Sequence, residues 1–210
     1  MLLFSLTNVV YKNLIYYPNI EIAENSTTFI CGESGSGKST LLKLLNGVVS
    51  ADSGEILYAG NSIEEYDPVI FRREVLLCGQ SAYLFDGNIR DNFSDYYKYR
   101  ELSALSTVEI MQYLKICAAE FSLDTNCAKM SGGERQRIFT AICLSMRPKV
   151  LLLDEPTSAL DDETSNMVMK NIKNFCNKNT ITLIVVSHNK ALSEIYADST
   201  VLLEGGSRSG

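Results

Sequence analysis

Short apolar runs recur along this chain and are separated by longer stretches with helical periodicity. Residues 3–11 and 14–22 alternate apolar and polar side chains, which predicts a strand in each segment. A turn is expected at Ser53-Gly54. The apolar runs predict further strands at residues 27–31, 55–59, 75–78, 150–153, 181–186 and 200–203.

Helices are predicted between these strands. Residues 38–48 are amphipathic, with Leu41, Leu42, Leu45 and Val48 on one side, and two more helices are expected at residues 162–177 and 190–197. Because strands alternate with helices, the sequence predicts an α/β fold with a mainly parallel core sheet.

The stretch from residue 81 to residue 147 is predicted to be a mainly helical insertion in that sheet. Two sets of residues recur there at helical spacing: Val108, Met111, Leu114 and Ala118, and Ile138, Ile142 and Ser145. The length fits one domain over residues 1–204. The small, polar residues 205–210 are expected to be a disordered tail.

Composition narrows the classes of function. With 19 basic and 25 acidic side chains, the net charge of −6 counts against nucleic acid as the main partner. No signal peptide is recognised at the start, and no run approaches the roughly 20 apolar residues of a membrane helix. A membrane-spanning part, if function requires one, is therefore expected on another chain.

The cysteines and the single histidine offer no recognisable zinc site. None of the six cysteines forms a C-x-x-C pair, and several lie inside apolar runs. Reduced thiols that pack as small hydrophobic groups are expected at Cys31, Cys78, Cys117, Cys127, Cys143 and Cys176.

A glycine-rich loop between a predicted strand and a predicted helix matches G-x-x-x-x-G-K-[ST]. Its glycines let backbone N–H groups turn towards phosphate oxygens, and the helix that follows directs its positive end at the same anion. Lys38 is expected to reach the β- and γ-phosphates, Ser39 to bind Mg²⁺, and Thr40 to meet the α-phosphate side. The predicted nucleotide-binding residues are Gly32, Glu33, Ser34, Gly35, Ser36, Gly37, Lys38, Ser39 and Thr40. Alone, this motif does not separate kinases, GTPases and ATPases.

Two acidic residues, Asp154 and Glu155, follow directly after an apolar strand. Ligands of open α/β sheets bind at the carboxyl ends of the strands, so both acids should face the phosphates. Adjacent strand residues point in opposite directions, which allows two roles. We expect Asp154 to hold Mg²⁺ and Glu155 to orient the attacking water and accept its proton. A turn with two solvated acids is the alternative.

The sequence Met-Ser-Gly-Gly-Glu-Arg-Gln-Arg at residues 130–137 resembles the LSGGQ signature of ABC ATPases, with Met130 for Leu and Glu134 for Gln. Ser131, Gly132 and Gly133 would open a helix and form a second anion-binding terminus. A chain with one nucleotide does not need two such termini. The resemblance implies that this signature completes the site of a partner subunit, with two ATP molecules held head to tail.

Other motifs of the family follow in order. Gln80 resembles the Q-loop glutamine, which contacts Mg²⁺ and the attacking water, and residues 158–161 resemble the D-loop. His188 is at the switch-histidine position, where it would contact the γ-phosphate. Tyr11 is the candidate for stacking on adenine, with Tyr16 and Tyr17 as alternatives and core packing as the simpler interpretation.

The resemblance covers roughly residues 3–204 and implies the ABC ATPase fold: a P-loop NTPase with an N-terminal antiparallel β-subdomain and an inserted helical subdomain. It implies a Mg-dependent ATPase that pairs as a homodimer, or with another nucleotide-binding subunit, and powers a separate transmembrane permease subunit. The expected location is cytoplasmic, on the inner face of the cell membrane through that permease. Neither the transported substrate nor its direction follows from the sequence.

Within the family, residues 81–92 are similar to the LF-x-G-T-I-x-D-N stretch of exporter-type subunits. Residues 123–127 replace the acidic, glycine-containing segment of fused exporters, and the short form is closer to stand-alone bacterial subunits, including probable iron exporters.

Aromatic residues crowd one part of the predicted helical region: Phe85, Phe93, Tyr96, Tyr97 and Tyr99. Most are expected in the core, and some could line a groove for a membrane subunit. Two other functions stay open at this point. An ABC-type ATPase acting on nucleic acid would usually carry a coiled-coil insertion or tandem units. A P-loop kinase would leave the signature and His188 unexplained.

Overall fold

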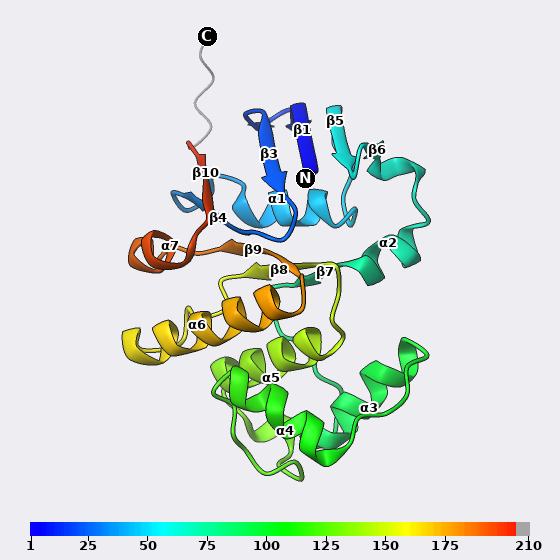
Figure 1. Cartoon of the computed structure of the whole chain (residues 1–210), viewed down its shortest axis with the longest axis vertical. Coiled ribbons are helices and arrows are strands. Elements are labelled where there is room, and N and C mark those ends of the chain that lie inside the picture. Colours follow the sequence, from blue (N-terminus) through cyan, green and yellow to red (C-terminus); the bar gives the residue numbers. More distant parts are fainter. Residues whose placement is uncertain (205–210) are drawn as a thin grey trace.

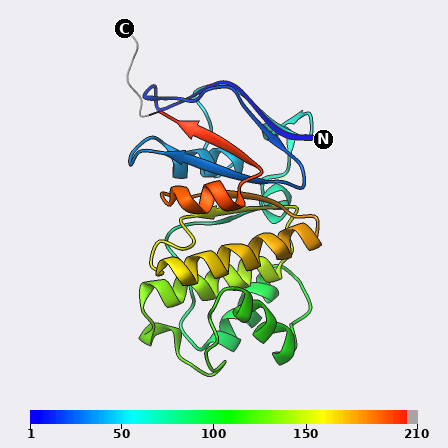
Figure 2. The same cartoon turned by 60° about the vertical axis from the view of Figure 1, so that its left-hand side comes forward.

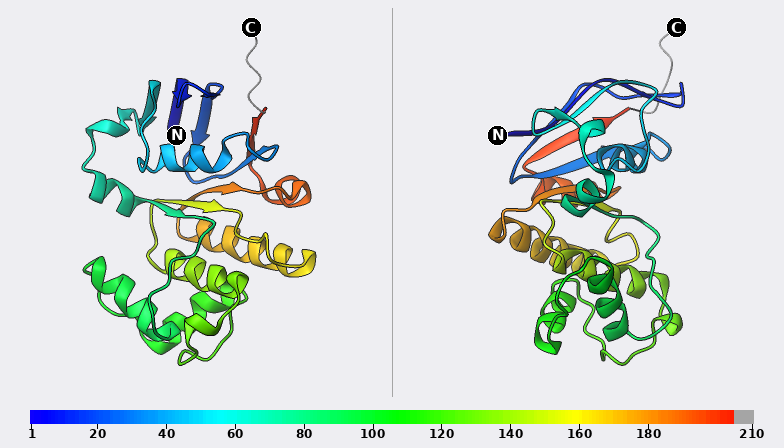
Figure 3. Two further views of the ribbon diagram at one scale, coloured as in Figure 1. Left: turned by 180° about the vertical axis from the view of Figure 1, so that it is seen from behind. Right: turned by 90° about the vertical axis from the view of Figure 1, so that its right-hand side faces the viewer.

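The computed structural model describes residues 1–204, and the predicted tail at residues 205–210 lies outside them. Figure 1 shows three parts in order: an antiparallel sheet with the N-terminus, a parallel sheet in the middle, and a group of helices at the far end. Figures 2 and 3 show the same order of parts from three other directions. The predicted α/β fold, with its antiparallel β-subdomain and its inserted helices, is confirmed.

The parallel sheet has the strand order β10-β4-β9-β8-β7. Its strands are β4 (Thr27–Gly32), β7 (Val75–Cys78), β8 (Val150–Asp154), β9 (Thr182–Val186) and β10 (Ser199–Leu203). All four pairings are parallel, so the carboxyl ends of the strands lie along one edge. Every predicted strand of this sheet is present.

Side chains along each strand of the parallel sheet alternate between its two faces, and both faces are covered by other parts of the molecule. Leu151 and Leu153 of β8 pack into the core beneath α5 (Gly132–Ser145) and α6 (Asp162–Lys178). Val150 and Leu152 pack into the other core, with α1 (Lys38–Leu45) and the antiparallel sheet. A continuous apolar run is therefore what this position in the sheet requires.

The antiparallel sheet follows the order β2-β1-β5-β6, and β3 pairs with β1. Its strands are β1 (Leu2–Tyr11), β2 (Ile15–Tyr16), β3 (Ile20–Ala23), β5 (Ser53–Tyr58) and β6 (Asn61–Ser62). The single strand predicted at residues 14–22 was wrong, since it divides into β2 and β3 around Pro18. Proline has no N–H to donate to a strand ladder, which favours a break there.

The inserted region contains α3 (Ile89–Tyr99), α4 (Thr107–Ile116) and α5, joined by loops and by a 3₁₀ turn at Cys127–Lys129. Helices are present at both places where helical spacing predicted them. In α5, Ile138, Ile142 and Ser145 are buried. In α4, Val108 is 66% exposed, whereas Ile110, Tyr113 and Leu114 are buried, so the buried face only partly coincides with the residues that showed the spacing.

The end of α1 and the whole of α2 differ from the predictions. α1 ends at Leu45 because Gly47 takes a left-handed conformation with φ +67°, and this leaves Val48 exposed. α2 (Pro68–Glu74) was not predicted, although Asp67 caps it and Pro68 occupies its first turn. The remaining helices, α7 (Lys190–Tyr196) and the 3₁₀ turn Ile63–Glu65, are short.

All six cysteines lie within residues 1–204 and are free there, with five buried and Cys31 half-buried. No helix in this part of the chain combines the length and the apolar character needed to span a membrane.

The turn predicted at Ser53-Gly54 was wrong, because both residues belong to β5. The register between β1 and β5 shifts from Thr7↔Glu55 to Val10↔Ser53, which leaves Asn8 and Val9 opposite Gly54 in a bulge. Gly54 has φ +87°, and a Cβ there would lie 2.3 Å from the Asn8 carbonyl oxygen. Glycine is therefore required both by the backbone angle and by the close approach of β1.

We expect Gly54→Ala to lower the free energy of unfolding by about 3 kcal/mol, because it adds a backbone clash to left-handed strain. Gly60→Ala is the matched control: Gly60 has φ +85° but no atom within 4 Å of an added Cβ. That variant should lose only about 1 kcal/mol. Chemical denaturation of both variants measures the difference, and equal losses would show that the bulge contact is unimportant.

Candidate functional site

The glycine-rich loop joins β4 to α1, and its glycines allow the chain to turn where side chains would clash. A Cβ on Gly32 would lie 2.3 Å from the Leu203 carbonyl oxygen, while Gly35 and Gly37 have φ +82° and +92°. Gly37 is the N-cap of α1 and supplies no side chain to the first turn. The amides of that turn are therefore free of a side-chain cap, which suits an anion at the positive end of the helix.

Lys38 lies inside this loop. Its ammonium group donates hydrogen bonds to the carbonyl oxygens of Gly32 at 2.9 Å and Glu33 at 2.6 Å, and the side chain is buried. The hydroxyl of Ser36 is also buried and has no hydrogen-bond partner within residues 1–204. An enclosed cation and an unpaired hydroxyl in one loop fit a phosphate group, which accepts hydrogen bonds from both.

Tyr17 supports the loop from the antiparallel sheet. Its hydroxyl donates to the Gly37 carbonyl oxygen at 2.9 Å, and burial raises the pKa of Tyr17, which keeps this donor protonated. The ring is enclosed and does not present a face for stacking on a base. Of the three tyrosines considered from the sequence, Tyr16 is exposed and Tyr11 is half-buried, so these two remain candidates for adenine stacking.

The first acid after β8 meets the helix that follows the loop. Ser39 Oγ donates to Asp154 Oδ1 at 3.0 Å, which joins the end of β8 to the first turn of α1. Burial raises the pKa of Asp154, while the hydrogen bond from Ser39 opposes this shift. A hydroxyl and a carboxylate oxygen are ligands that Mg²⁺ prefers, and a cation would offset the cost of burying the charge.

Residues 1–204 contain no group of three His, Cys, Asp or Glu side chains that could hold a metal ion.

The second acid, Glu155, is the meeting point of three strand ends. Its Oε1 lies 2.8 Å from His188 Nε2, and its Oε2 accepts a hydrogen bond from Gln80 Nε2 at 3.4 Å. Gln80 follows β7 and His188 follows β9, so parallel pairing with β8 brings these three residues together. The arrangement can hold a carboxylate in a fixed orientation between two polar groups.

Glu155 also has an unusual backbone conformation. Its φ is +52°, in the left-handed region, and its N–H donates to the Val186 carbonyl oxygen at 3.0 Å. Non-glycine residues pay for this conformation, so it persists only where the surrounding structure enforces it. The pairing with β9 enforces it here and redirects the side chain away from the line of β8.

The signature begins α5. Ser131 is its N-cap: the Ser131 N–H donates to Glu134 Oε2 at 2.8 Å, and Glu134 N–H donates to Ser131 Oγ at 3.3 Å. These bonds lower the pKa of Glu134. The departure from the family's Gln at position 134 therefore closes a capping box, in which a carboxylate also favours the positive end of the helix.

Ser131 and Gly132 are exposed, whereas Gly133 packs against the segment after Glu155. A Cβ on Gly133 would lie 2.9 Å from the Cβ of Ala159. Within residues 1–204, no hydrogen bond joins the signature to the phosphate loop. Lys38, Ser39, Asp154, Glu155, Gln80 and His188 thus form one group, and the signature is separate from it.

The segment after Glu155 leads into α6. Ser158 Oγ donates to the Glu155 carbonyl oxygen at 3.2 Å, and Asp161 caps α6 by accepting from Thr164 N–H at 2.9 Å. Asp161 therefore has a local structural role in this chain.

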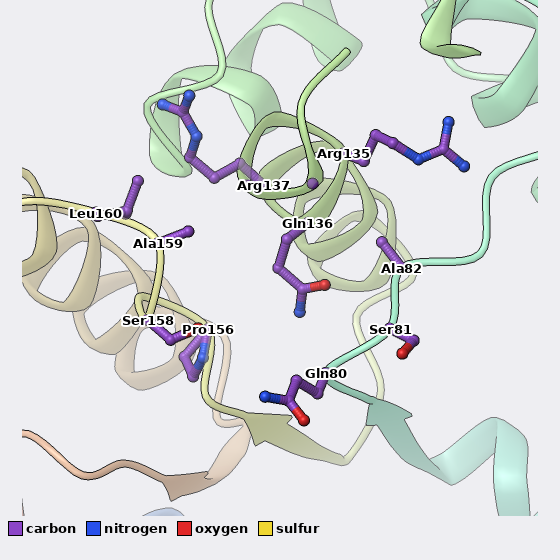
Figure 4. A pocket seen from close by; sticks show the side chains of 12 residues that line it. Gln80, Ser81, Ala82, Arg135, Gln136, Arg137, Pro156, Ser158, Ala159 and Leu160 are labelled. Atoms are coloured by element: carbon purple, nitrogen blue, oxygen red, sulfur yellow. The ribbon is translucent and has the colours of Figure 1, made fainter. Parts of the chain in front are cut away.

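A pocket of about 250 Å³ separates the two groups of residues. It lies between the segment at Gln80, the first turns of α5 and the segment at Pro156, and Figure 4 shows Gln80 and Gln136 pointing into it. The sequence did not indicate a role for Gln136, because its contacts depend on how α5 packs against the end of β7.

The crowded aromatic residues divide into two sets. Phe93 and Tyr97 are core residues, whereas Phe85 and Tyr96 are half-buried and Tyr83 and Tyr99 are exposed. The ring of Phe85 lies 5.2 Å from Tyr83, 5.3 Å from Tyr96 and 5.6 Å from Tyr99 between centroids. We call Tyr83, Phe85, Tyr96 and Tyr99 the aromatic patch.

Comparisons with known proteins show the family to which this fold belongs. A family model described as ABC transporter matches residues 17–158. The chain is 33% identical over 207 residues to "Probable iron export ATP-binding protein FetA" of Escherichia coli (strain K12), which covers 96% of this chain and 91% of that protein.

Two solved structures are similar in fold. A bacterial Atm1-family ABC exporter with ATP bound has a TM-score of 0.84 and 26% identity, over 97% of this chain and 37% of the exporter chain. The structure of cbiO1 from Clostridium perfringens, part of the ABC transporter complex cbiONQ, has a TM-score of 0.82 and 25% identity, over 98% of this chain and 86% of that chain.

Proposed function

This chain belongs to the ABC transporter family and is an ATPase of the kind coupled to transport, and we propose that two copies close head to tail around two Mg-ATP molecules and drive a separate membrane-spanning subunit. The separation of the signature from the phosphate loop is the observation that carries this proposal. Each chain holds a nearly complete site and, apart from its phosphate loop, a second, exposed helix N-terminus at Ser131. A second copy would bring that terminus to the γ-phosphate.

The phosphate loop is proposed to bind the triphosphate. Its backbone amides, the Lys38 ammonium and the first turn of α1 supply positive charge to the β- and γ-phosphates. Lys38 would exchange its bonds to Gly32 and Glu33 for bonds to phosphate oxygens. Tyr17 would keep the loop in place through Gly37.

Ser39 and Asp154 are proposed to hold Mg²⁺, with Gln80 as a further ligand. When bound, Mg²⁺ neutralises charge on the β- and γ-phosphates during transfer. Asp154 is the less exposed of the two acids. Burial raises its pKa by disfavouring the charged form, and a bound cation would offset that cost.

Glu155 is proposed to orient the attacking water and to accept a proton from it. As the water oxygen bonds to the γ-phosphorus, the bond to the β–γ bridging oxygen breaks and ADP leaves with that electron pair. His188 and Gln80 hold the two carboxylate oxygens at 2.8 and 3.4 Å, which fixes where the carboxylate can point. His188 would also contact the γ-phosphate, and Ser131 with Gly132 and Gly133 of the second copy would stabilise the charge on it.

The two alternative functions considered from the sequence, a P-loop kinase and an ABC-type ATPase that acts on nucleic acid, lose support. The family match excludes a P-loop kinase, and the relatives described above are named as transport proteins. Of these names, that of FetA alone gives a transported substance, and we propose neither a substrate nor a direction of transport for this chain. This chain would be located at the inner face of the membrane only through its binding to the membrane subunit.

The aromatic patch is proposed to receive a cytoplasmic helix of the membrane subunit. Exposed rings cluster there, as is typical of protein interfaces. The patch begins three residues after Gln80, and Tyr96 Oη donates to the Tyr83 carbonyl oxygen at 2.7 Å, which ties the patch to the segment carrying Gln80. Movement of a docked helix would therefore be transmitted to the site of hydrolysis.

We expect Glu155→Gln to retain ATP and to accumulate as a dimer, while steady-state hydrolysis falls by about 10²- to 10⁴-fold because the general base is lost. Sedimentation with and without ATP measures the dimer, and phosphate release measures turnover. Asp162→Asn, at an exposed acid in the first turn of α6, is the charge-matched control and should behave as wild type. Turnover of Glu155→Gln near the wild-type rate would exclude Glu155 as the base.

We expect the double variant Tyr83→Ser/Phe85→Ser to lose transport in a reconstituted transporter while the isolated chain keeps its ATPase activity. Val69→Ser/Ile70→Ser is the matched control, since both residues are about 60% exposed and lie on α2. Transport by that control should be unchanged. Loss of soluble ATPase activity before loss of transport in the patch variant would contradict docking at the patch.

A further inference from the structure

Gln136, one turn into α5, contacts the chain immediately before Gln80. Its Nε2 donates to the Gly79 carbonyl oxygen at 3.0 Å, and the residue is only 9% exposed. Resting on the function proposed above, we propose that Gln136 is a positioning residue that couples the signature helix to Gln80 of the same chain.

The orientation of the Gln136 amide is set by its partner. The Gly79 carbonyl oxygen can only accept a hydrogen bond, so the amide nitrogen must face it. The amide oxygen is itself buried and has no hydrogen-bond partner within residues 1–204. A buried amide with one acceptor left open is costly and is retained where it has a specific use.

A second contact lies one turn further along α5. Thr140 Oγ1 donates to the Gln136 carbonyl oxygen at 2.9 Å and lies 3.5 Å from Cys78 Sγ. α5 therefore meets two successive residues, Cys78 and Gly79, directly before Gln80. The Thr140 contact is at the last residue of β7, within the sheet, whereas the Gln136 contact is at the first residue that has left it.

These contacts form a short series that connects the start of α5 with Glu155. Ser131 and Gly132 lie at the start of α5, Gln136 follows within the next turn, and Gly79 directly precedes Gln80, which reaches Glu155 at 3.4 Å. A shift of α5 when its N-terminus binds the second copy's nucleotide would move Gly79 and reset Gln80 against Glu155. Nucleotide bound at one site of the dimer would thus change the position of Gln80 at the other site.

Gln136→Met tests this coupling, because it removes the donor and keeps the length of the side chain. We expect kcat to fall about fivefold, as for the loss of one buried hydrogen bond, with the KM and the equilibrium Kd for Mg-ATP within about twofold of wild type. Gln136→Glu, which turns an acceptor towards Gly79, should lower kcat further. Ser145→Ala is the control on the same helix, since its hydroxyl bonds only to the Ile142 carbonyl oxygen, and it should match wild type.

A double-mutant cycle separates coupling from a general packing defect. If Gln136 acts through Gln80, the combination of Gln80→Ala with Gln136→Met should be no slower than Gln80→Ala alone. Additive losses, or a parallel loss of Mg-ATP affinity, would overturn the proposal.

Hydrogen exchange without nucleotide tests the contact independently of the ATPase reaction. Amides of residues 79–82 should exchange about fivefold faster in Gln136→Met, and those of β8 should be unchanged. Unchanged exchange at residues 79–82 would refute the positioning role. If Gln80→Ala alone hydrolyses ATP as wild type does, the role proposed for Gln80 fails, and hydrogen exchange still decides whether Gln136 holds this segment.

Discussion

The parallel pairing of five strands is the constraint on which the rest of this structure depends. It places the ends of β4, β7, β8 and β9 along one edge, so residues from distant parts of the sequence meet there. The hydrogen bond from Ser39 to Asp154 joins the loop after β4 to the end of β8 across the intervening strand β9. Burial of both sheet faces fixes the strands, and the polar groups are confined to their ends.

The parallel sheet also keeps the signature apart from the polar residues at the strand ends. α5 packs beneath the sheet, and its N-terminus lies beyond the pocket that separates it from Gln80. The chain consequently has two helix N-termini suited to anions, at Gly37 and at Ser131, that no hydrogen bond within residues 1–204 joins. In the proposed dimer both of them would bind phosphate, and Gln136 would relate one to the other within each chain.

Much of the fold could be predicted because its signals are local. The runs at residues 75–78 and 150–153 are continuous and apolar, and the loop at residues 32–39 is specified by glycine, lysine and serine at fixed spacing. Other features depend on contacts between distant segments. The buried face of α4 was not predicted, because it is set in part by the packing of Tyr113 against Phe175 of α6, and Gly54 was assigned to a turn because its partner Asn8 is remote in sequence. The hydrogen bond of Tyr17 to Gly37 and the role of Gln136 were not predicted for the same reason.

Mixing two inactive variants tests most directly whether the site is shared between two copies. Lys38→Ala removes the ammonium of the phosphate loop, and Ser131→Arg blocks the signature. Each variant alone should be inactive. In an equal mixture, half of the dimers should contain one intact loop facing one intact signature, so activity should return to about a quarter of the wild-type value. A mixture no more active than the variants measured separately would contradict a shared site.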